Sequence, residues 1–299
     1  SINRNAVYTI RFDADELMAP DTLARFADRW AAFCAGDGPT RIAVIGGGVA
    51  GVELALACAE RMRGLGRAAQ VAVIDRGAIL DGLPGRVRLW QAMDAYGIQR
   101  IEGAAPTEVT QDAVILSDGR EVASEFTIGA AGAVPHPWLA TCGMDMRDGF
   151  MVVDDQLRSV SHPEIYGAGD CVHLSHAPRP KAGVFAVRAA PVLAWNLRAD
   201  LVGAQRRRFR PQRDFLKLVS LGGREALAEK AGWTWSGSAM WRWKDRIDQR
   251  FMDNLRHLPA TPRALPPAGS ARGVAQEMAG PAPCGGCAKP ISARNGMRA

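Results

Sequence analysis

Residues 42–53 read Ile-Ala-Val-Ile-Gly-Gly-Gly-Val-Ala-Gly-Val-Glu. The first four are wholly apolar, as in a strand that is buried on both faces of a parallel sheet. After the glycines, apolar residues recur at the spacing of one helix face. A second apolar strand, residues 71–74, ends at Asp75. These segments together predict a βαβ unit, and therefore an α/β fold with a parallel sheet.

The glycine turn between the first strand and the helix needs its glycines for separate reasons. Gly46 permits the tight turn, Gly48 lets the backbone approach a pyrophosphate, and Gly51 lets helix and strand pack closely. The amide dipoles of the helix then face the phosphate charge. We therefore predict that this turn binds the pyrophosphate of an NAD-type cofactor. The predicted site consists of Gly46, Gly47, Gly48, Val49, Ala50 and Gly51.

Three charged residues near the turn bear on which nucleotide binds. A carboxylate at the position of Asp75 accepts a hydrogen bond from the adenosine ribose 2′-OH and repels a 2′-phosphate, which favours NAD(H) over NADP(H). The adjacent Arg76 favours the opposite choice. Glu53, placed in the first turn of the helix, has two interpretations: a favourable interaction with the helix N-terminus, or a functional position beside the nicotinamide.

Composition is that of an ordinary globular protein, with 47% apolar and 23% charged residues. No apolar run approaches the ~18 residues that cross a bilayer, and no N-terminal targeting signal is present. We therefore expect a cytoplasmic protein. Five arginines lie between residues 206 and 213, where a solvated loop is favoured over a phosphate-binding patch. Only one aromatic residue lies among them, so nucleic-acid binding is not expected.

The cysteines and histidines give little sign of a metal site. Four scattered cysteines, Cys34, Cys58, Cys142 and Cys171, are interpreted as buried free thiols. Cys284 and Cys287 have a meaningful spacing, but zinc needs four ligands and no second pair lies nearby. We interpret His173 and His176 as loop residues.

The rest of the chain predicts further strands and helices. Residues 240–255 carry an apolar stripe among arginines and lysines, which could be covered by the protein core, by a second copy in a homodimer, or by a membrane surface. The other expected elements are a strand within residues 6–12, a helix from about 23 to 33, a helix over 86–96, strands through 109 and 114–116 with a turn at 118–119, strands at 126–129, 150–153 and 164–166, a helix over 182–201, and two or three strands after 209.

Three motifs occur in the order found in pyridine nucleotide-disulfide oxidoreductases, a family that this sequence resembles. They are the glycine turn, residues 130–135 (Ala-Ala-Gly-Ala-Val-Pro) and residues 165–170 (Ile-Tyr-Gly-Ala-Gly-Asp). The resemblance implies a Rossmann-like flavoprotein fold with two dinucleotide-binding domains, which bind FAD and NAD(H). It places Gly132 at the crossover between the domains, Gly169 and Asp170 against the flavin ribityl-pyrophosphate, and Lys181, Ala182 and Gly183 near the isoalloxazine.

The family's first FAD-binding glycine turn has no counterpart upstream of residue 41, so we expect an incomplete FAD domain and a fragment of a longer flavoprotein. The expected divisions are a lead-in segment from the FAD domain at 1–40, an NAD(H)-binding domain at 41–130, the C-terminal half of the FAD domain at 131–203, a small α+β part at 204–258, and a linker without fixed structure at 259–299.

A narrower resemblance concerns residues 179–188, 241–252 and 284–289, which are similar to the flavoprotein module fused ahead of selenide, water dikinase. It implies a C-terminal dikinase domain in the full-length protein, with Cys287 and Lys289 matching its reactive pair. Too few residues follow Cys287 for dikinase activity in this chain alone.

The function expected from the sequence is that of an FAD-dependent NADH oxidoreductase. Hydride passes from NADH to flavin and on to a small-molecule acceptor, for which a quinone and a selenium or sulfur species are both considered. Gly183 and Arg188 stand where type II NADH dehydrogenases carry glutamines, which argues against quinone. The alternative is a non-catalytic NAD(H)-binding or regulatory module. A membrane-bound stripe would place the protein peripherally at the inner membrane face.

Overall fold

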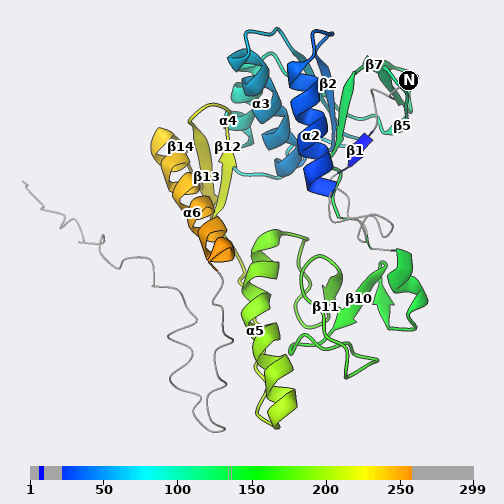
Figure 1. The fold of residues 1–299 in the computed structure, drawn as a ribbon, viewed down its shortest axis with the longest axis vertical. Helices are drawn as coiled ribbons and strands as arrows, with labels where there is room; N and C mark the ends of the chain where they lie inside the picture. Colours follow the sequence, from blue (N-terminus) through cyan, green and yellow to red (C-terminus); the bar gives the residue numbers. More distant parts are fainter. Residues whose placement is uncertain (1–6, 10–21, 134, 136, 258–299) are drawn as a thin grey trace, which may run out of the picture.

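The computed structural model describes residues 7–9, 22–133, 135 and 137–257. Its largest sheet is parallel throughout and has the strand order β1-β8-β2-β3-β4. The predicted α/β fold with a parallel sheet is therefore confirmed (Figure 1). The strands are β1 (Val7–Thr9), β2 (Arg41–Ile45), β3 (Gln70–Ile74), β4 (Gln99–Ile101) and β8 (Phe126–Gly129).

Three helices cover this sheet: α2 (Thr22–Ala35), α3 (Val49–Gly64) and α4 (Arg86–Ala95). The Trp30 and Phe33 rings of α2 lie 5.3 and 5.0 Å from the ring of Phe126 in β8. We expected residues 1–40 to lead in from an FAD domain. The described part of this segment packs on the parallel sheet, because its aromatic face finds its apolar partners there.

A small antiparallel sheet lies between β4 and β8 in the sequence. It consists of β5 (Pro106–Val109), β6 (Ala113–Leu116) and β7 (Glu121–Ala123). The predicted turn at Asp118–Gly119 joins β6 to β7, and Gly119 takes a φ of +83° that favours glycine.

The next segment forms a second hydrophobic core around β9 (Met146–Arg147), β10 (Phe150–Val153), β11 (Val172–Leu174) and helix α5 (Gly183–Val202). The prediction of a strand at residues 164–166 is wrong. That segment makes a single bridge, between Arg158 and Tyr166, and the Tyr166 hydroxyl donates to Asp200 of α5 at 2.6 Å. The strand is β11 instead, so His173 lies in a strand and not in a loop.

The last described segment is the sheet β12 (Lys217–Ser220), β13 (Ala226–Lys230) and β14 (Trp233–Gly237), followed by helix α6 (Ser238–Arg256). Val219 and Leu227 of this sheet belong to the same core as α3 and α4. Residues 204–216 form the predicted loop, in which Arg207 stacks at 3.7 Å on the Trp195 ring and Arg206 pairs with Asp200. None of the described helices combines the length and apolarity that crossing a membrane requires.

The described cysteines are free, but only one of the four is buried. Cys58 is 5% exposed, and burial raises its pKa to about 12, so its thiolate is scarce at neutral pH. Cys142 is exposed, so the expectation of a buried thiol is wrong for this residue. The reason is that Cys142 directly follows a short 3-10 helix, Pro137–Thr141. The Cys284–Cys287 pair and the linker at 259–299 lie outside the described residues.

We expect a thiol-alkylating reagent at pH 8 to modify Cys142 and to spare Cys58 in the folded protein. The reason is that only a thiolate reacts, and Cys58 is both shielded and protonated. Peptide mapping by mass spectrometry measures the two sites separately, and unfolding in urea should make them equally reactive. Rapid labelling of Cys58 in the folded protein would show that this face of helix α3 is not buried in the core.

Candidate functional site

The glycine turn lies between the carboxyl end of β2 and the start of α3. Gly46 has a φ of +119°, and its N–H donates to the Ile74 carbonyl at 2.8 Å. A Cβ atom on Gly46 would lie 2.4 Å from the Ala130 oxygen, and one on Gly51 would lie 1.9 Å from the Gly46 oxygen. Gly46 therefore lies close against the Ala130 backbone, and Gly51 lets the start of α3 lie close against the Gly46 carbonyl.

Gly48 differs from these glycines because its missing side chain faces open space. No atom lies within 4 Å of the Cβ position, and Gly48 is the N-cap of α3 without a side-chain cap hydrogen bond. The first amides of α3 are thus left for another acceptor. An oxyanion approaching Gly48 would meet these amides and the positive end of the helix dipole.

We expect Gly48→Ala to weaken NADH binding by roughly 10-fold or more, because the added methyl group occupies the space through which a pyrophosphate approaches. Its φ of −74° suits alanine, so the melting temperature should stay unchanged. Gly64→Ala, at the other end of α3 and also in open space, is the matched control and should bind NADH normally. Equal affinities in a calorimetric titration of the two variants would contradict this role for Gly48.

Asp75 lies at the end of β3, beside the glycine turn, and its carboxylate supports the loop backbone. One oxygen accepts from the Gly47 N–H at 2.6 Å and the other from the Gly77 N–H at 2.8 Å. The Gly47 carbonyl in turn accepts from the Leu80 N–H at 2.8 Å. Asp75 therefore braces the turn, and each oxygen keeps a lone pair for a ribose hydroxyl. Arg76 next to it is exposed.

Glu53 does not lie in the first turn of α3, because the helix begins at Val49 and Glu53 is its fifth residue. Glu53 therefore does not interact with the helix N-terminus, and its carboxylate instead contacts residues that are distant in sequence. Its Oε1 accepts from the Ser220 N–H at 2.9 Å and lies 3.6 Å from Lys244 Nζ. Glu53 thus ties β12 and α6 to the nucleotide-type domain.

One cleft of about 1080 Å³ joins most of these residues. The glycine turn forms one wall, the start of α5 a second, and residues 215–219 of the β12 segment a third. Gly47 and Gly51 do not line it, since they are packed behind the turn. The predicted site residues that do line it are Gly46, Gly48, Val49, Ala50, Glu53, Asp75, Arg76, Gly132, Lys181, Ala182 and Gly183.

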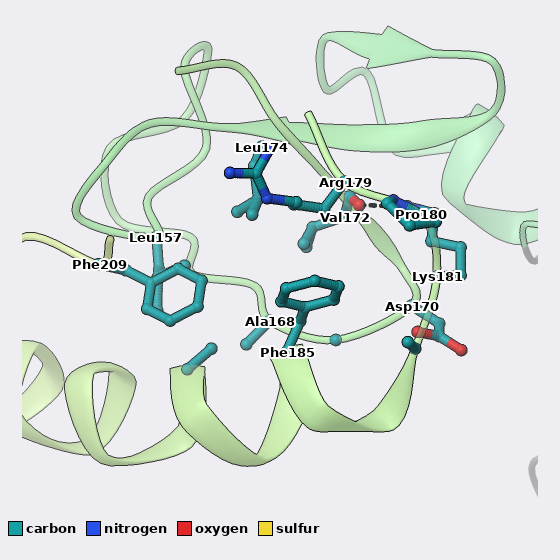
Figure 2. Close-up of a pocket in the computed structure, with 13 residues that line it drawn as sticks. Leu157, Ala168, Asp170, Val172, Leu174, Arg179, Pro180, Lys181, Phe185 and Phe209 are labelled. Carbon is teal, nitrogen blue, oxygen red and sulfur yellow. Dashed lines mark hydrogen bonds between the residues drawn. The ribbon is translucent and has the colours of Figure 1, made fainter. Parts of the chain in front are cut away.

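Gly169 and Asp170 line a smaller hollow, together with Lys181 and Phe185 of the α5 segment (Figure 2). Gly169 has a φ of +84°, which allows the sharp turn before Asp170. Lys181 Nζ donates to the Val172 carbonyl and lies 3.7 Å from the centre of the Phe150 ring. Burial lowers the pKa of Lys181, and the nearby Asp170 opposes that shift. Lys181 belongs to both hollows and so connects them.

Two features of the site were not predicted. Lys217 and its neighbours from Phe215 to Val219 form a cleft wall, and nothing in their alternating pattern distinguishes them from an ordinary strand. Arg179 Nε is buried and has no hydrogen-bond partner among the described residues. Among the described residues, no group of three or more potential metal ligands occurs.

Comparison with known proteins gives matches along most of this region. The family model for pyridine nucleotide-disulphide oxidoreductases matches residues 14–190. Nitric oxide reductase FlRd-NAD(+) reductase of Vibrio vulnificus is 34% identical over 142 residues, which cover 44% of this chain and 35% of the relative. Dihydrolipoyl dehydrogenase of Pseudomonas aeruginosa is 30% identical over 190 residues, which cover 60% of this chain and 37% of the relative.

Solved structures share the fold. The sulfide:quinone oxidoreductase of Aquifex aeolicus superimposes with a TM-score of 0.60 and 18% identity, over 79% of this chain and 62% of that one. The chain spans about a third of the length of the curated relatives that it matches. Because the family model covers more than half of the sequence and includes the glycine turn and the start of α5, the chain belongs to the pyridine nucleotide-disulphide oxidoreductase family.

Proposed function

We propose that this chain is the NAD(H)-binding part of an FAD-dependent NAD(P)H oxidoreductase. The observation that carries the proposal is the single cleft of about 1080 Å³ in which the glycine turn faces the start of α5. Family membership supports both cofactors, NAD(H) and FAD. The proposed division keeps the boundaries 1–40, 41–130, 131–203, 204–258 and 259–299.

The residues of the glycine turn fit a dinucleotide. Gly48 leaves a space that a Cβ atom would fill, and the uncapped amides of α3 point to an acceptor there. Asp75 retains lone pairs for the ribose, which supports NADH, whereas the exposed Arg76 beside it leaves room for NADPH. Glu53 and Val49 line the cleft beyond the turn, where a nicotinamide ring would extend.

The fit to FAD is partial. Asp170, Lys181 and Arg179 surround the smaller hollow, and the buried Arg179 Nε–H, which has no partner among the described residues, calls for an acceptor. A second strand–glycine–helix turn, which would bind the FAD pyrophosphate, does not occur among the described residues. Asp170 and Gly169 would therefore hold the ribityl side, with Lys181, Ala182 and Gly183 towards the ring.

FAD, when bound, supplies the acceptor for the hydride of NADH. This chain's own contribution is then binding and orientation rather than acid–base chemistry. The glycine turn holds the nucleotide phosphates. Gly132, at the crossover, takes a φ of +96°, a backbone conformation that favours glycine. The apolar residues Phe215, Leu216 and Leu218 limit water at the third wall of the cleft.

For the rest of the reaction, we propose a small-molecule acceptor, a quinone or a selenium or sulfur species. A link to selenide, water dikinase as a C-terminal domain rests on the resemblance of residues 179–188, 241–252 and 284–289, and the last of these segments lies outside the described residues. A cytoplasmic location and a homodimer also remain proposals. The competing function is a non-catalytic NAD(H)-binding or regulatory module.

Absorbance spectra of the purified full chain separate the two functions. An oxidoreductase should carry, or take up on reconstitution with FAD, a flavin absorption band that bleaches when NADH is added without oxygen. A chain that binds NADH but neither retains nor takes up FAD would be the non-catalytic module. A flavin band that NADH leaves unchanged would contradict hydride transfer.

A further inference from the structure

Helix α6 is amphipathic but has no buried residue in the structure. Trp243, Ile247, Phe251 and Leu255 follow one another at four-residue spacing, so they share one side of the helix. Their exposed fractions are 45%, 42%, 44% and 51%. Of the three alternatives for this stripe, packing in the protein core is therefore excluded for these four residues.

A row of arginines borders this apolar row. Arg242, Arg246 and Arg250 each precede one of the apolar residues and are themselves four residues apart, so they line the adjacent side of α6. All three are exposed, and none of them has an ion pair or hydrogen bond with another described residue. Their positive charge is therefore uncompensated within the described chain.

The acidic residues of α6 do not balance that charge. Asp248 pairs with Lys244 at 2.8 Å, and Asp253 pairs with Arg256 at 3.2 Å. Asp245 accepts from the Gln249 amide at 2.8 Å. The surface beside the apolar row is thus basic, although the whole helix contains charges of both signs.

Strand β14 adds two indole side chains to this surface. Thr234 points towards α4, since a Cβ on Gly85 would lie 2.8 Å from Thr234 Cγ2. Successive side chains of a strand alternate between faces. Trp233 and Trp235 therefore point to the other face of the small sheet, the face that carries α6, with exposed fractions of 71% and 53%.

We infer that α6 and β14 form a docking surface for an anionic phospholipid bilayer. Indole rings prefer the headgroup level, and arginines beside an apolar row bind lipid phosphates while their stems cover apolar surface. A second copy of the chain is the weaker candidate, because it brings the same arginine row, and Asp248 and Asp253 of its α6 are already in ion pairs. This inference does not depend on the proposed function, since the surface lies outside the nucleotide cleft.

The test is flotation of the full chain with vesicles of phosphatidylcholine alone and of an equal mixture with phosphatidylglycerol. We expect flotation with the mixed vesicles, and loss of it at high salt. The triple variant Arg242→Gln, Arg246→Gln, Arg250→Gln should lower the partition coefficient on the order of 100-fold. Trp243→Ser with Phe251→Ser should lower it by about 10-fold or more.

The matched control is the triple variant Arg61→Gln, Arg198→Gln, Arg210→Gln, which removes the same charge from exposed arginines outside α6. It should bind vesicles almost as well as the unchanged chain, and thermal melts should show that all variants are folded. The inference is overturned if the unchanged chain fails to float with the mixed vesicles, or if the two triple variants behave alike. It is also overturned if sedimentation shows a dimer that Trp243→Ser with Phe251→Ser dissociates and that does not bind vesicles.

Discussion

Replacing Gly51 by alanine should lower the melting temperature by roughly 6–10 °C and abolish NADH binding. The Cβ atom would lie 1.9 Å from the Gly46 oxygen and 3.5 Å from a Val44 methyl, and the first of these atoms belongs to backbone that is itself hydrogen-bonded. The turn and the start of α3 must therefore move apart. Overpacking of this kind costs about 3 kcal/mol, which gives the stated shift in melting temperature.

Gly64→Ala is the control for this change, because it makes the same substitution in the same helix, in open space. It should keep or slightly raise the melting temperature, since alanine favours helix more than glycine does. Scanning calorimetry and an NADH titration measure both properties. If Gly51→Ala melts and binds like Gly64→Ala, the close approach of helix and strand is not as described.

The second large effect is expected at the ion pair between Lys217 of β12 and Glu229 of β13. Glu229 is 3% exposed, and it also accepts from the Gly232 N–H at 3.1 Å. Lys217→Met leaves this buried carboxylate without its cation. Breaking a fully buried pair costs about 3–5 kcal/mol. Because the Lys217 side chain is 29% exposed, we expect a smaller loss in the free energy of unfolding, about 2 kcal/mol.

We attribute this loss to charge and not to lost packing, because Lys217→Met keeps most of the side-chain volume and leaves the buried Glu229 carboxylate without its cation. The double variant Lys217→Met, Glu229→Gln should therefore recover most of the loss in urea unfolding. A deficit that the double variant retains would mean that lost packing, not charge, is responsible.

Local patterns in the sequence were enough to predict the nucleotide-type domain. The apolar strand, the glycines and the strand that ends at Asp75 are consecutive, so their periodicities determine the βαβ unit. The strand expected at residues 164–166 was wrong because its apolar residues serve other contacts. Tyr166 reaches Asp200 on α5, and Val172 and Leu174 supply the buried strand positions beside β10.

The site could be predicted where its residues are close in sequence. The hydrogen bond from the Ser220 N–H to Glu53 joins residues 167 positions apart, and no local pattern indicates such a contact. The same holds for Lys217, whose place in the cleft wall follows from how β12 packs on α3. The apolar stripe of α6 was visible in the sequence, but only its exposure separates a core helix from a surface one.

The central claim is that the cleft between the glycine turn and α5 binds NAD(H). Calorimetric titration of the full chain with NADH tests it most directly. The expected result is saturable binding of a single NADH with a dissociation constant in the range of roughly 1 µM to 1 mM, weakened by Gly48→Ala and unchanged by Gly64→Ala. Absence of saturable binding, or equal binding by both variants, would contradict the claim.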